Sequence, residues 1–290
     1  MAEGWGNYAV NYAKEEKEAM MGYYSQLATN ILFNNTQRGE KVNFLDVAAG
    51  PAVLTLRVGE ALHTKDVDKA VSTITVTDFA STMVELANKR IQASQTLQSL
   101  GILIQVRMMD ACAPDLPEHS VTHLGCMFGI MFFEQRAQAL ECLRRLLSPG
   151  GTALFSTWQH SDYLDILGDF GHFVHVPNEL IEQEVHAPPL SIDHDSEELY
   201  SDLQVAGYSN IEIMQEEKSF QFTNNQDFFD TLLCNPILSK MFPFLVQRNR
   251  SDLLNQWHTF LHSEKGRKWV TEDNEKLVMR FVANIAVCSA

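Results

Sequence analysis

The chain has 290 residues, of which 45% are hydrophobic and 20% charged, and its formal net charge is −15 at pH 7. This length allows a large buried core, while the negative charge disfavours nucleic acid and anionic membranes as partners. No apolar run is long enough to cross a bilayer, and the five cysteines form no CxxC pair, so we expect a cytoplasmic protein with reduced thiols and no metal site.

In chain order, the first predicted element is a helical segment over residues 8–33, whose apolar side chains have the spacing typical of two helices. Apolar and β-branched runs then predict strands that alternate with helices. These strands cover residues 41–47, 71–77, 102–108, 121–127 and 152–158. Thr82 and Glu85 have the spacing of a capping box at the start of the helix after the second strand. The alternation predicts a doubly wound parallel sheet.

The regular alternation ends after Trp158, where an insertion rich in histidine, proline and aromatic residues follows. Residues 211–214 and 220–222 suggest further strand, and the apolar run over 276–288 predicts a last strand inserted beside the others. The expected organisation is an N-terminal helical segment over 1–35 that closes over a ligand, a ligand-binding core over 36–158, a lid over 159–195, a core helix and strand over 196–223, a helical cap over 224–270 and a last core strand over 271–290.

Three carboxylates, Asp46, Asp78 and Asp110, follow successive predicted strands. In an open α/β sheet these strand ends line one crevice, where an acidic residue after the second strand can accept both hydroxyls of a ribose. Each Asp could instead cap the next helix, since Asp is a favoured N-cap residue. Three in register, with a loop of small residues at the first, favour a nucleoside-containing cofactor.

The loop over residues 48–53 argues against a dinucleotide. It contains one glycine, Gly50, where dinucleotide binding requires G-x-G-x-x-G so that the backbone can approach a pyrophosphate. Pro51 also removes one backbone N–H that a phosphate would bind. The sequence contains no Walker loop, so another nucleoside cofactor is indicated.

Four segments in this order resemble the class I S-adenosylmethionine-dependent methyltransferases. The segment 46–52, DVAAGPA, resembles motif I, whose usual form is D/E-x-G-x-G-x-G, with Ala48 and Ala52 in place of the outer glycines. An alanine at the first position is common in the ubiquinone/menaquinone-type branch. The other three segments are similar to the family's D-x-S-x-x-M, D-A-x-x-L-P and R-x-L-x-P-G-G motifs, and lie at residues 78–83, 110–117 and 144–151.

This resemblance implies a Rossmann-like α/β fold with a seven-stranded mixed sheet, helices on both faces and a helical cap. It also implies the cofactor S-adenosyl-L-methionine, the product S-adenosyl-L-homocysteine and a set of cofactor-binding residues. In that set, the methionine moiety lies on Asp46, Ala48, Ala49 and Gly50, the ribose on Asp78, the ring systems against Phe79 and Met83, the adenine amino group at Asp110 and Ala111, and the sulfonium above Cys126 and Met127, with Tyr12 closing over the adenosine.

The acceptor side is expected after the fourth and fifth strands. A general base is needed only where the acceptor arrives protonated, and histidine suits that role near neutral pH. His160 follows the fifth strand most closely and is the candidate base, although a histidine there is more often a surface or packing residue. Phe128, Trp158, His172 and Phe173 are the candidate substrate residues.

The predicted function is in-line methyl transfer to an oxygen, nitrogen or carbon atom of a small, partly apolar organic molecule. A protein methyltransferase is one alternative, because the negative charge permits a basic peptide. A non-catalytic scaffold that has lost or only binds the cofactor is the other, with Ala52 the feature that favours it. The oligomeric state is open, with a homodimer among the alternatives.

Overall fold

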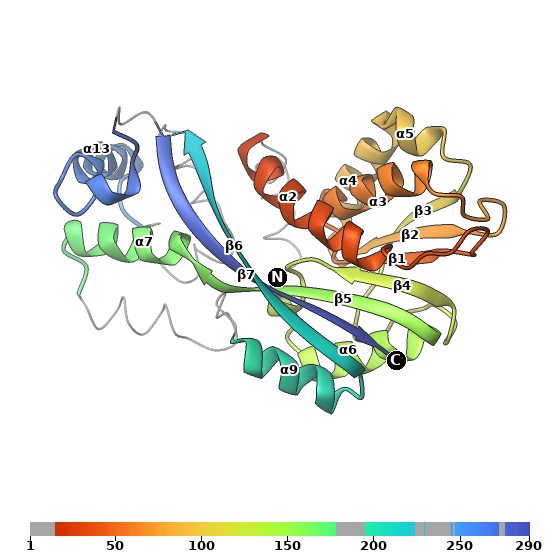
Figure 1. Ribbon diagram of the computed structural model, residues 1–290. Coiled ribbons are helices and arrows are strands. Elements are labelled where there is room, and N and C mark those ends of the chain that lie inside the picture. The colour runs from red at the N-terminus through yellow and green to blue at the C-terminus, as the bar shows by residue number, and fades with distance from the viewer. Residues whose placement is uncertain (1–14, 178–194, 224–228, 230–244, 246, 273–275) are drawn as a thin grey trace.

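The computed structural model describes residues 15–177, 195–223, 229, 245, 247–272 and 276–290. A seven-stranded sheet runs through the molecule, with strand order β3-β2-β1-β4-β5-β7-β6 (Figure 1). The strands are β1 Asn43–Val47, β2 Thr73–Asp78, β3 Leu103–Met108, β4 Val121–Cys126, β5 Leu147–Ser161, β6 Ser209–Thr223 and β7 Lys276–Ser289. Strands β1 to β5 are parallel, and β7 is antiparallel to both β5 and β6.

This arrangement confirms the mixed seven-stranded sheet expected from the sequence, including the insertion of the C-terminal strand beside the others. The helices are α2 Glu15–Leu32, α3 Val53–Thr64, α4 Ser81–Ala93, α5 Gln95–Gln98, η1 Ile130–Phe132, α6 Arg136–Leu146, α7 Asp162–Phe173, α9 Ser196–Val205, α13 Arg250–Leu261 and η2 Arg267–Trp269. No helix in the described ranges is long and apolar enough to cross a membrane.

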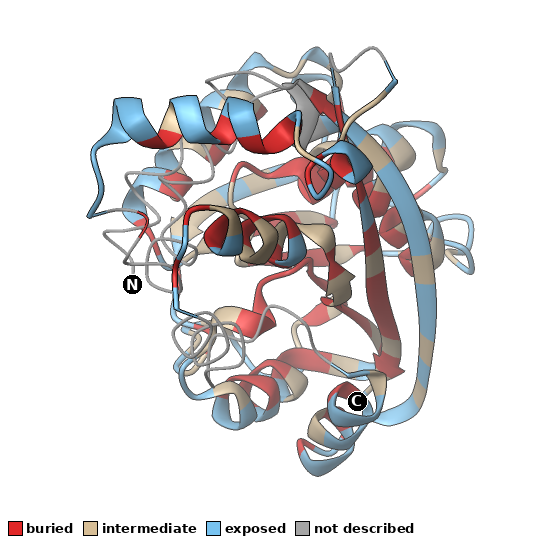
Figure 2. Cartoon of the chain, turned by 90° about the vertical axis from the view of Figure 1, so that its left-hand side faces the viewer, coloured by how far each residue is buried: buried red, intermediate tan, exposed pale blue. Residues whose placement is uncertain are grey.

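Two hydrophobic clusters fix the helices to opposite faces of the sheet. Side chains of α2, α3, α4 and α5 share one cluster with Phe44 and Ile74 of the sheet. Those of α6 and α9 share the other cluster with Leu45 and Leu124. Neighbouring residues of one strand therefore enter different clusters, as the alternation of side chains along a strand requires. Figure 2 shows the strands buried between these helical layers.

The strands β5, β6 and β7 are longer than the other four and extend beyond the helical layers (Figure 1). At their far end, α7 and α13 pack on one another around Phe170, whose ring meets Trp257 at 5.2 Å and Phe260 at 5.6 Å between centroids. Because Phe170, Trp257 and Phe260 are all fully buried, this aromatic cluster holds the described part of the cap together.

The segments 211–214 and 220–222, both predicted as strand, are confirmed and belong to one strand, β6, because the polar residues between them also pair with β7. Thr82 and Glu85 form no capping box, since α4 begins at Ser81 without a side-chain cap. Its preceding amide, that of Ala80, donates instead to Asp78 Oδ1 at 2.9 Å. The prediction of two helices over 8–33 stays a prediction, since α2 is described there and residues 8–14 lie outside the described residues.

Candidate functional site

A cavity of about 330 Å³ lies at the carboxyl ends of β1, β2 and β4, where α2 covers the loop that follows β1. This is within the size range of small-ligand pockets, which starts at about 300 Å³. The crevice at the end of a parallel sheet is where such folds bind their ligands. Its lining comprises Met21, Ser25, residues 46–51, Val53, Leu54, residues 78–80, Met83, residues 109–112, residues 127–129 and residues 132–135.

Three residues of the loop between β1 and α3 have left-handed backbone conformations. The φ angles are +52° at Ala48, +51° at Gly50 and +60° at Ala52. Ala48 and Ala52 stand where the motif usually has glycine, so the loop keeps the glycine conformation with alanine residues. A left-handed L-residue costs about 1–2 kcal/mol, and such strain is often found at ligand sites.

Asp46, the last buried polar residue of β1, ties the loop to α3. Its Oδ2 accepts hydrogen bonds from the backbone N–H of Thr55 at 3.1 Å and from the Thr55 hydroxyl at 2.6 Å. Its Oδ1 is buried and has no hydrogen-bond partner among the described residues, and the residue lines the cavity. Burial raises the pKa of Asp46 to about 7, while the bonds from Thr55 oppose this shift.

Asp78, at the end of β2, holds the loop from the other side. Its Oδ2 accepts a hydrogen bond from the Gly50 N–H at 2.9 Å, so the two predicted cofactor segments are directly bonded. Burial raises the pKa of Asp78, although backbone N–H groups donate to its carboxylate. Beside it, Phe79 is 57% exposed and lines the cavity, while Met83 is buried beneath. An exposed ring at the mouth is available to pack on a planar group.

The third carboxylate, Asp110, stands at the same edge of the sheet. Its Oδ1 accepts a hydrogen bond from the Cys112 N–H at 2.8 Å, which shapes the turn that includes Ala111. Asp110, Ala111 and Cys112 all line the cavity. The structure thus brings together the three carboxylates that the sequence places at successive strand ends.

Aromatic side chains form the wall after β4. Phe128 lines the cavity with a left-handed φ of +53°, and its N–H donates to Ser156 Oγ at 2.9 Å. Its ring stacks on that of Trp158 at 3.9 Å between centroids and 17° between planes. Tyr24 of α2 meets both rings edge-on. Trp158, a predicted substrate residue, therefore stands behind Phe128 and does not itself line the cavity.

Several predicted site residues lie elsewhere. Cys126 is fully buried in the cluster beneath α6 and α9, because it points to the opposite face of β4 from Met127. His172 is exposed on α7, and Phe173 of the same helix packs on Phe260. Neither lines the cavity. Tyr12 lies outside the described residues.

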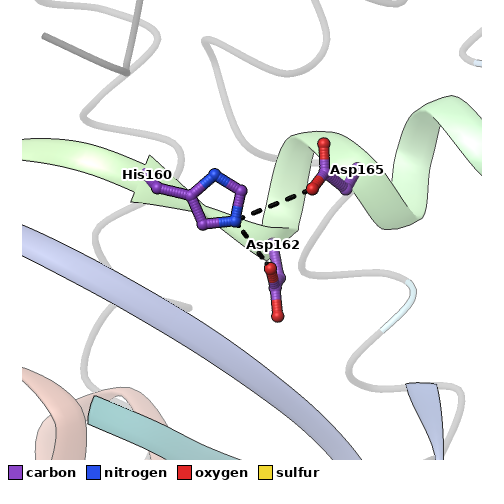
Figure 3. Close-up of side chains that lie close together, drawn as sticks. All are labelled: His160, Asp162 and Asp165. Atoms are coloured by element: carbon purple, nitrogen blue, oxygen red, sulfur yellow. Dashed lines mark hydrogen bonds and ion pairs between the residues drawn. The ribbon is translucent and has the colours of Figure 1, made fainter. Parts of the chain in front are cut away.

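His160, the candidate base, is also outside the cavity lining. Figure 3 shows it at the end of β5, beside the first turn of α7. Its Nε2 lies 2.8 Å from Asp162 Oδ1 and 3.7 Å from Asp165 Oδ2. The His160 ring nitrogen and one carboxylate oxygen of each aspartate lie within 4.8 Å of one another, a spacing compact enough for a cation. No sequence motif indicated this grouping. Both carboxylate oxygens of Asp162 already have hydrogen-bond partners within the protein. Oδ1 bonds to His160, and Oδ2 accepts the Arg280 N–H at 2.6 Å.

The cavity lining also includes two residues of α2, Met21 and Ser25, that no sequence motif indicated. They are one helical turn apart and share a face of the helix. Only the packing of α2 against the core brings them to the cavity, so no local motif could have revealed them. Ser25 is 1% exposed, and its hydroxyl has no hydrogen-bond partner among the described residues.

Residues 54–155 match a family model described as a methyltransferase domain. Methyltransferase ucsB from Acremonium sp is 22% identical over 235 residues, which cover 80% of this chain and 78% of that protein. Acetylaranotin bis-thiomethyltransferase from Aspergillus terreus is 27% identical over 151 residues, covering 51% of this chain and 47% of that protein. This chain therefore aligns with less than half of the second relative.

Among solved structures, the YcgJ protein from Bacillus subtilis has the same fold, with a TM-score of 0.54 and 13% identity over 92% of this chain and 98% of that chain. The CurJ carbon methyltransferase has a TM-score of 0.51 and 12% identity over 92% of this chain and 54% of that chain. The family match over residues 54–155 confirms the resemblance seen in the sequence, and the structural comparison shows the shared fold.

We expect Ala48→Gly to leave the free energy of unfolding unchanged or raise it by up to about 1 kcal/mol, because glycine removes the left-handed strain. Ala49→Gly is the matched control, since Ala49 is equally half-buried in the same loop but has no positive φ. It should lower the free energy of unfolding by about 0.5–1 kcal/mol. Urea unfolding measures both, and equal losses in the two variants would contradict a strained Ala48.

The raised pKa of Asp46 predicts a pH-dependent stability. The folded protein keeps the Asp46 carboxyl protonated up to about pH 7, whereas the unfolded chain loses this proton near pH 4. The resulting contribution to the free energy of unfolding is therefore complete below pH 4 and is lost as the pH rises through 7. Asp46→Asn removes the titrating carboxyl group. The free energy of unfolding of the variant should therefore rise relative to that of wild type by up to about 1.4 kcal/mol per pH unit between pH 5 and 7. Urea unfolding of wild type and Asp46→Asn from pH 5 to 8 tests this, since the contributions of other titrating groups cancel in the difference between the two proteins. A difference that does not change with pH would contradict the prediction.

Proposed function

We propose that this chain, a class I S-adenosylmethionine-dependent methyltransferase, methylates an oxygen, nitrogen or carbon atom of a small, partly apolar organic molecule. The observation that carries the proposal is the shared cavity, in which the motif I loop and all three strand-end carboxylates meet an aromatic wall. Both comparisons with named relatives are consistent with it, since these are a methyltransferase and a bis-thiomethyltransferase. Because the second relative is named a bis-thiomethyltransferase, sulfur is a further acceptor atom to test.

The described residues fit the cofactor. Asp78 has carboxylate oxygens for the ribose hydroxyls, and Phe79 offers a ring face at the mouth. Asp46 and Ser25 both line the cavity, and the atoms Asp46 Oδ1 and Ser25 Oγ are buried without partners among the described residues. A buried polar group without a partner costs about 1–3 kcal/mol, so a polar ligand that bonds to either atom would offset part of that cost.

The bound cofactor supplies an activated methyl group, so the protein must align donor and acceptor and exclude water. Phe128 is suited to the acceptor side, because its strained backbone is fixed by Ser156 and its ring by Trp158. Met21, Met127 and Phe132 add apolar lining beside it. A flat, partly apolar acceptor would lie against this wall with little bound water.

His160 is the proposed base where the acceptor is a protonated alcohol, phenol or thiol. The Asp162 carboxylate bonded to Nε2 favours the tautomer with the proton on that nitrogen, leaving Nδ1 to accept a proton. His160 follows Trp158 on the same strand, and Trp158 stacks on a cavity residue. His160 lies outside the described cavity lining, so this role requires an acceptor that reaches past the aromatic wall.

A protein methyltransferase is the first alternative, and a scaffold without catalysis the second. The net charge of −15 permits a basic peptide as acceptor. The cavity wall that includes Phe128, however, is lined by aromatic and apolar side chains. The scaffold alternative rests on Ala52, whose left-handed backbone preserves the loop conformation that a glycine would have. A screen of small phenols, amines and thiols beside a histone-like basic peptide separates the three.

The first test is calorimetric titration with S-adenosylmethionine and S-adenosylhomocysteine. Asp78→Ala should weaken both by about 30-fold or more, because it removes hydrogen bonds of about 2 kcal/mol from a charged acceptor. Asp66→Ala, an exposed carboxylate paired with Arg38, is the control and should change neither. Circular dichroism checks that the variants fold. Unchanged binding in Asp78→Ala, or no binding by wild type, would overturn the cofactor assignment.

His160→Gln should lower turnover by about 100-fold with an acceptor that must lose a proton, while leaving cofactor affinity unchanged. His258→Gln, an exposed histidine on α13, is the matched control and should keep full activity. Transfer of a radiolabelled methyl group to acceptors from the screen measures the effect. Full activity in His160→Gln would remove this residue as the base.

A further inference from the structure

Tyr24 of α2 packs against the aromatic wall of the cavity. This residue is fully buried, is not part of the described cavity lining and lies outside every methyltransferase motif in the sequence. Its ring lies 5.5 Å from that of Phe128 and 5.3 Å from that of Trp158 between centroids, at 79° to each. Because Phe128 and Trp158 are themselves stacked at 3.9 Å, Tyr24 stands beside the stack and packs on both rings. Such perpendicular contacts are a favourable aromatic geometry.

A fourth aromatic residue, Phe281 of β7, connects Tyr24 and Trp158 a second time. The ring of Phe281 lies 5.3 Å from that of Trp158, and the Phe281 carbonyl accepts the Tyr24 hydroxyl at 3.4 Å. Tyr24 therefore contacts the stack with its ring and the sheet with its hydroxyl. These contacts join α2, the loop after β4, β5 and β7, so packing between segments far apart in the sequence sets the position of the stack.

Phe128, which lines the cavity, depends on this support. Its φ of +53° is unusual for a bulky residue, and such a backbone persists where the surrounding contacts fix it. Its N–H donates to Ser156 Oγ at 2.9 Å, which fixes the backbone. Trp158 and Tyr24 are the ring neighbours of Phe128 among the described residues, so they fix the side chain. Trp158 covers one face of the Phe128 ring and leaves the other face without an aromatic neighbour in the described part of the chain.

We propose that Tyr24 is a positioning residue that makes the site select planar acceptors. It holds the stack of Phe128 and Trp158 in one orientation, and the acceptor packs on the Phe128 face that Trp158 leaves uncovered. A planar ring stacks there over its whole face, whereas a puckered ring of the same size makes fewer close contacts. Without the Tyr24 ring the stack can tilt, and the discrimination between the two shapes is lost. This inference rests on the proposed methyl transfer and goes beyond it by naming the acceptor shape and the residue that selects it.

The test compares two hydroxyl compounds that share one carbon skeleton, planar 2-naphthol and its saturated analogue decahydro-2-naphthol. Calorimetric titration of the protein saturated with S-adenosylhomocysteine measures both affinities. Wild type should bind 2-naphthol about tenfold more tightly, because only the planar ring stacks on Phe128. Tyr24→Leu should reduce this ratio to about twofold and leave the affinity for S-adenosylhomocysteine within about twofold of wild type. Tyr24→Phe, which keeps the ring, should retain the wild-type ratio.

Tyr208→Leu is the matched control, because Tyr208 makes the same kinds of contact in the cluster on the other face of the sheet. It is buried, its ring lies 5.5 Å from that of Phe155 at 77°, and its hydroxyl donates to the Leu140 carbonyl at 3.1 Å. This variant should lower the melting temperature, as Tyr24→Leu does, and keep the wild-type ratio of the two affinities.

Three results would overturn the inference. Wild type could bind S-adenosylhomocysteine but show no preference for 2-naphthol or bind neither compound, and the proposed function would then still stand. Tyr24→Leu could keep the wild-type ratio, or Tyr208→Leu could lose it equally. If Tyr24→Leu does not fold, Tyr24→Met replaces it, because the flexible methionine side chain adapts to an irregular gap. If wild type does not bind S-adenosylhomocysteine, the proposed function fails, and this inference fails with it.

Discussion

The site depends on how the loop after β1 is held between two carboxylates. Asp46 bonds to Thr55 at the start of α3, and Asp78 bonds to the Gly50 amide from the next strand. The loop between them has left-handed backbone at Ala48, Gly50 and Ala52, which an unsupported chain would avoid. The two carboxylates hold this conformation and keep the cavity beside it open.

Both carboxylates are desolvated by the same burial that makes their hydrogen bonds strong. The pKa of Asp46 rises to about 7, and that of Asp78 is raised as well. Burying these groups lowers stability, and a ligand that bonds to Asp46 Oδ1 offsets part of the loss. This unfavourable energy is thus stored beside the cavity, while the aromatic cap around Phe170 contributes packing.

The longer strands explain how one sheet serves two purposes. Near the cavity, the carboxyl ends of β1, β2 and β4 present backbone and carboxylates. Beyond the helical layers, β5, β6 and β7 continue and carry α7 and α13 (Figure 1). Trp158 and His160 lie on β5 between these two parts, so acceptor recognition is expected where core and cap meet. Figure 2 shows β7 buried beside the largely exposed outer strand.

The sequence by itself determined the positions of the strands up to β5 along the chain, the strand-end carboxylates Asp46, Asp78 and Asp110, and the loop of small residues, because each is a local pattern of burial or spacing. It could not determine which face of β4 Cys126 would take, nor that Ser25 and Met21 would reach the cavity, because these follow from how α2 and the strands pack. The proximity of His160 to Asp162 and Asp165 likewise depends on the turn from β5 into α7. Local chemistry thus determined the predicted cofactor segments, and long-range packing decided which residues share the cavity with them.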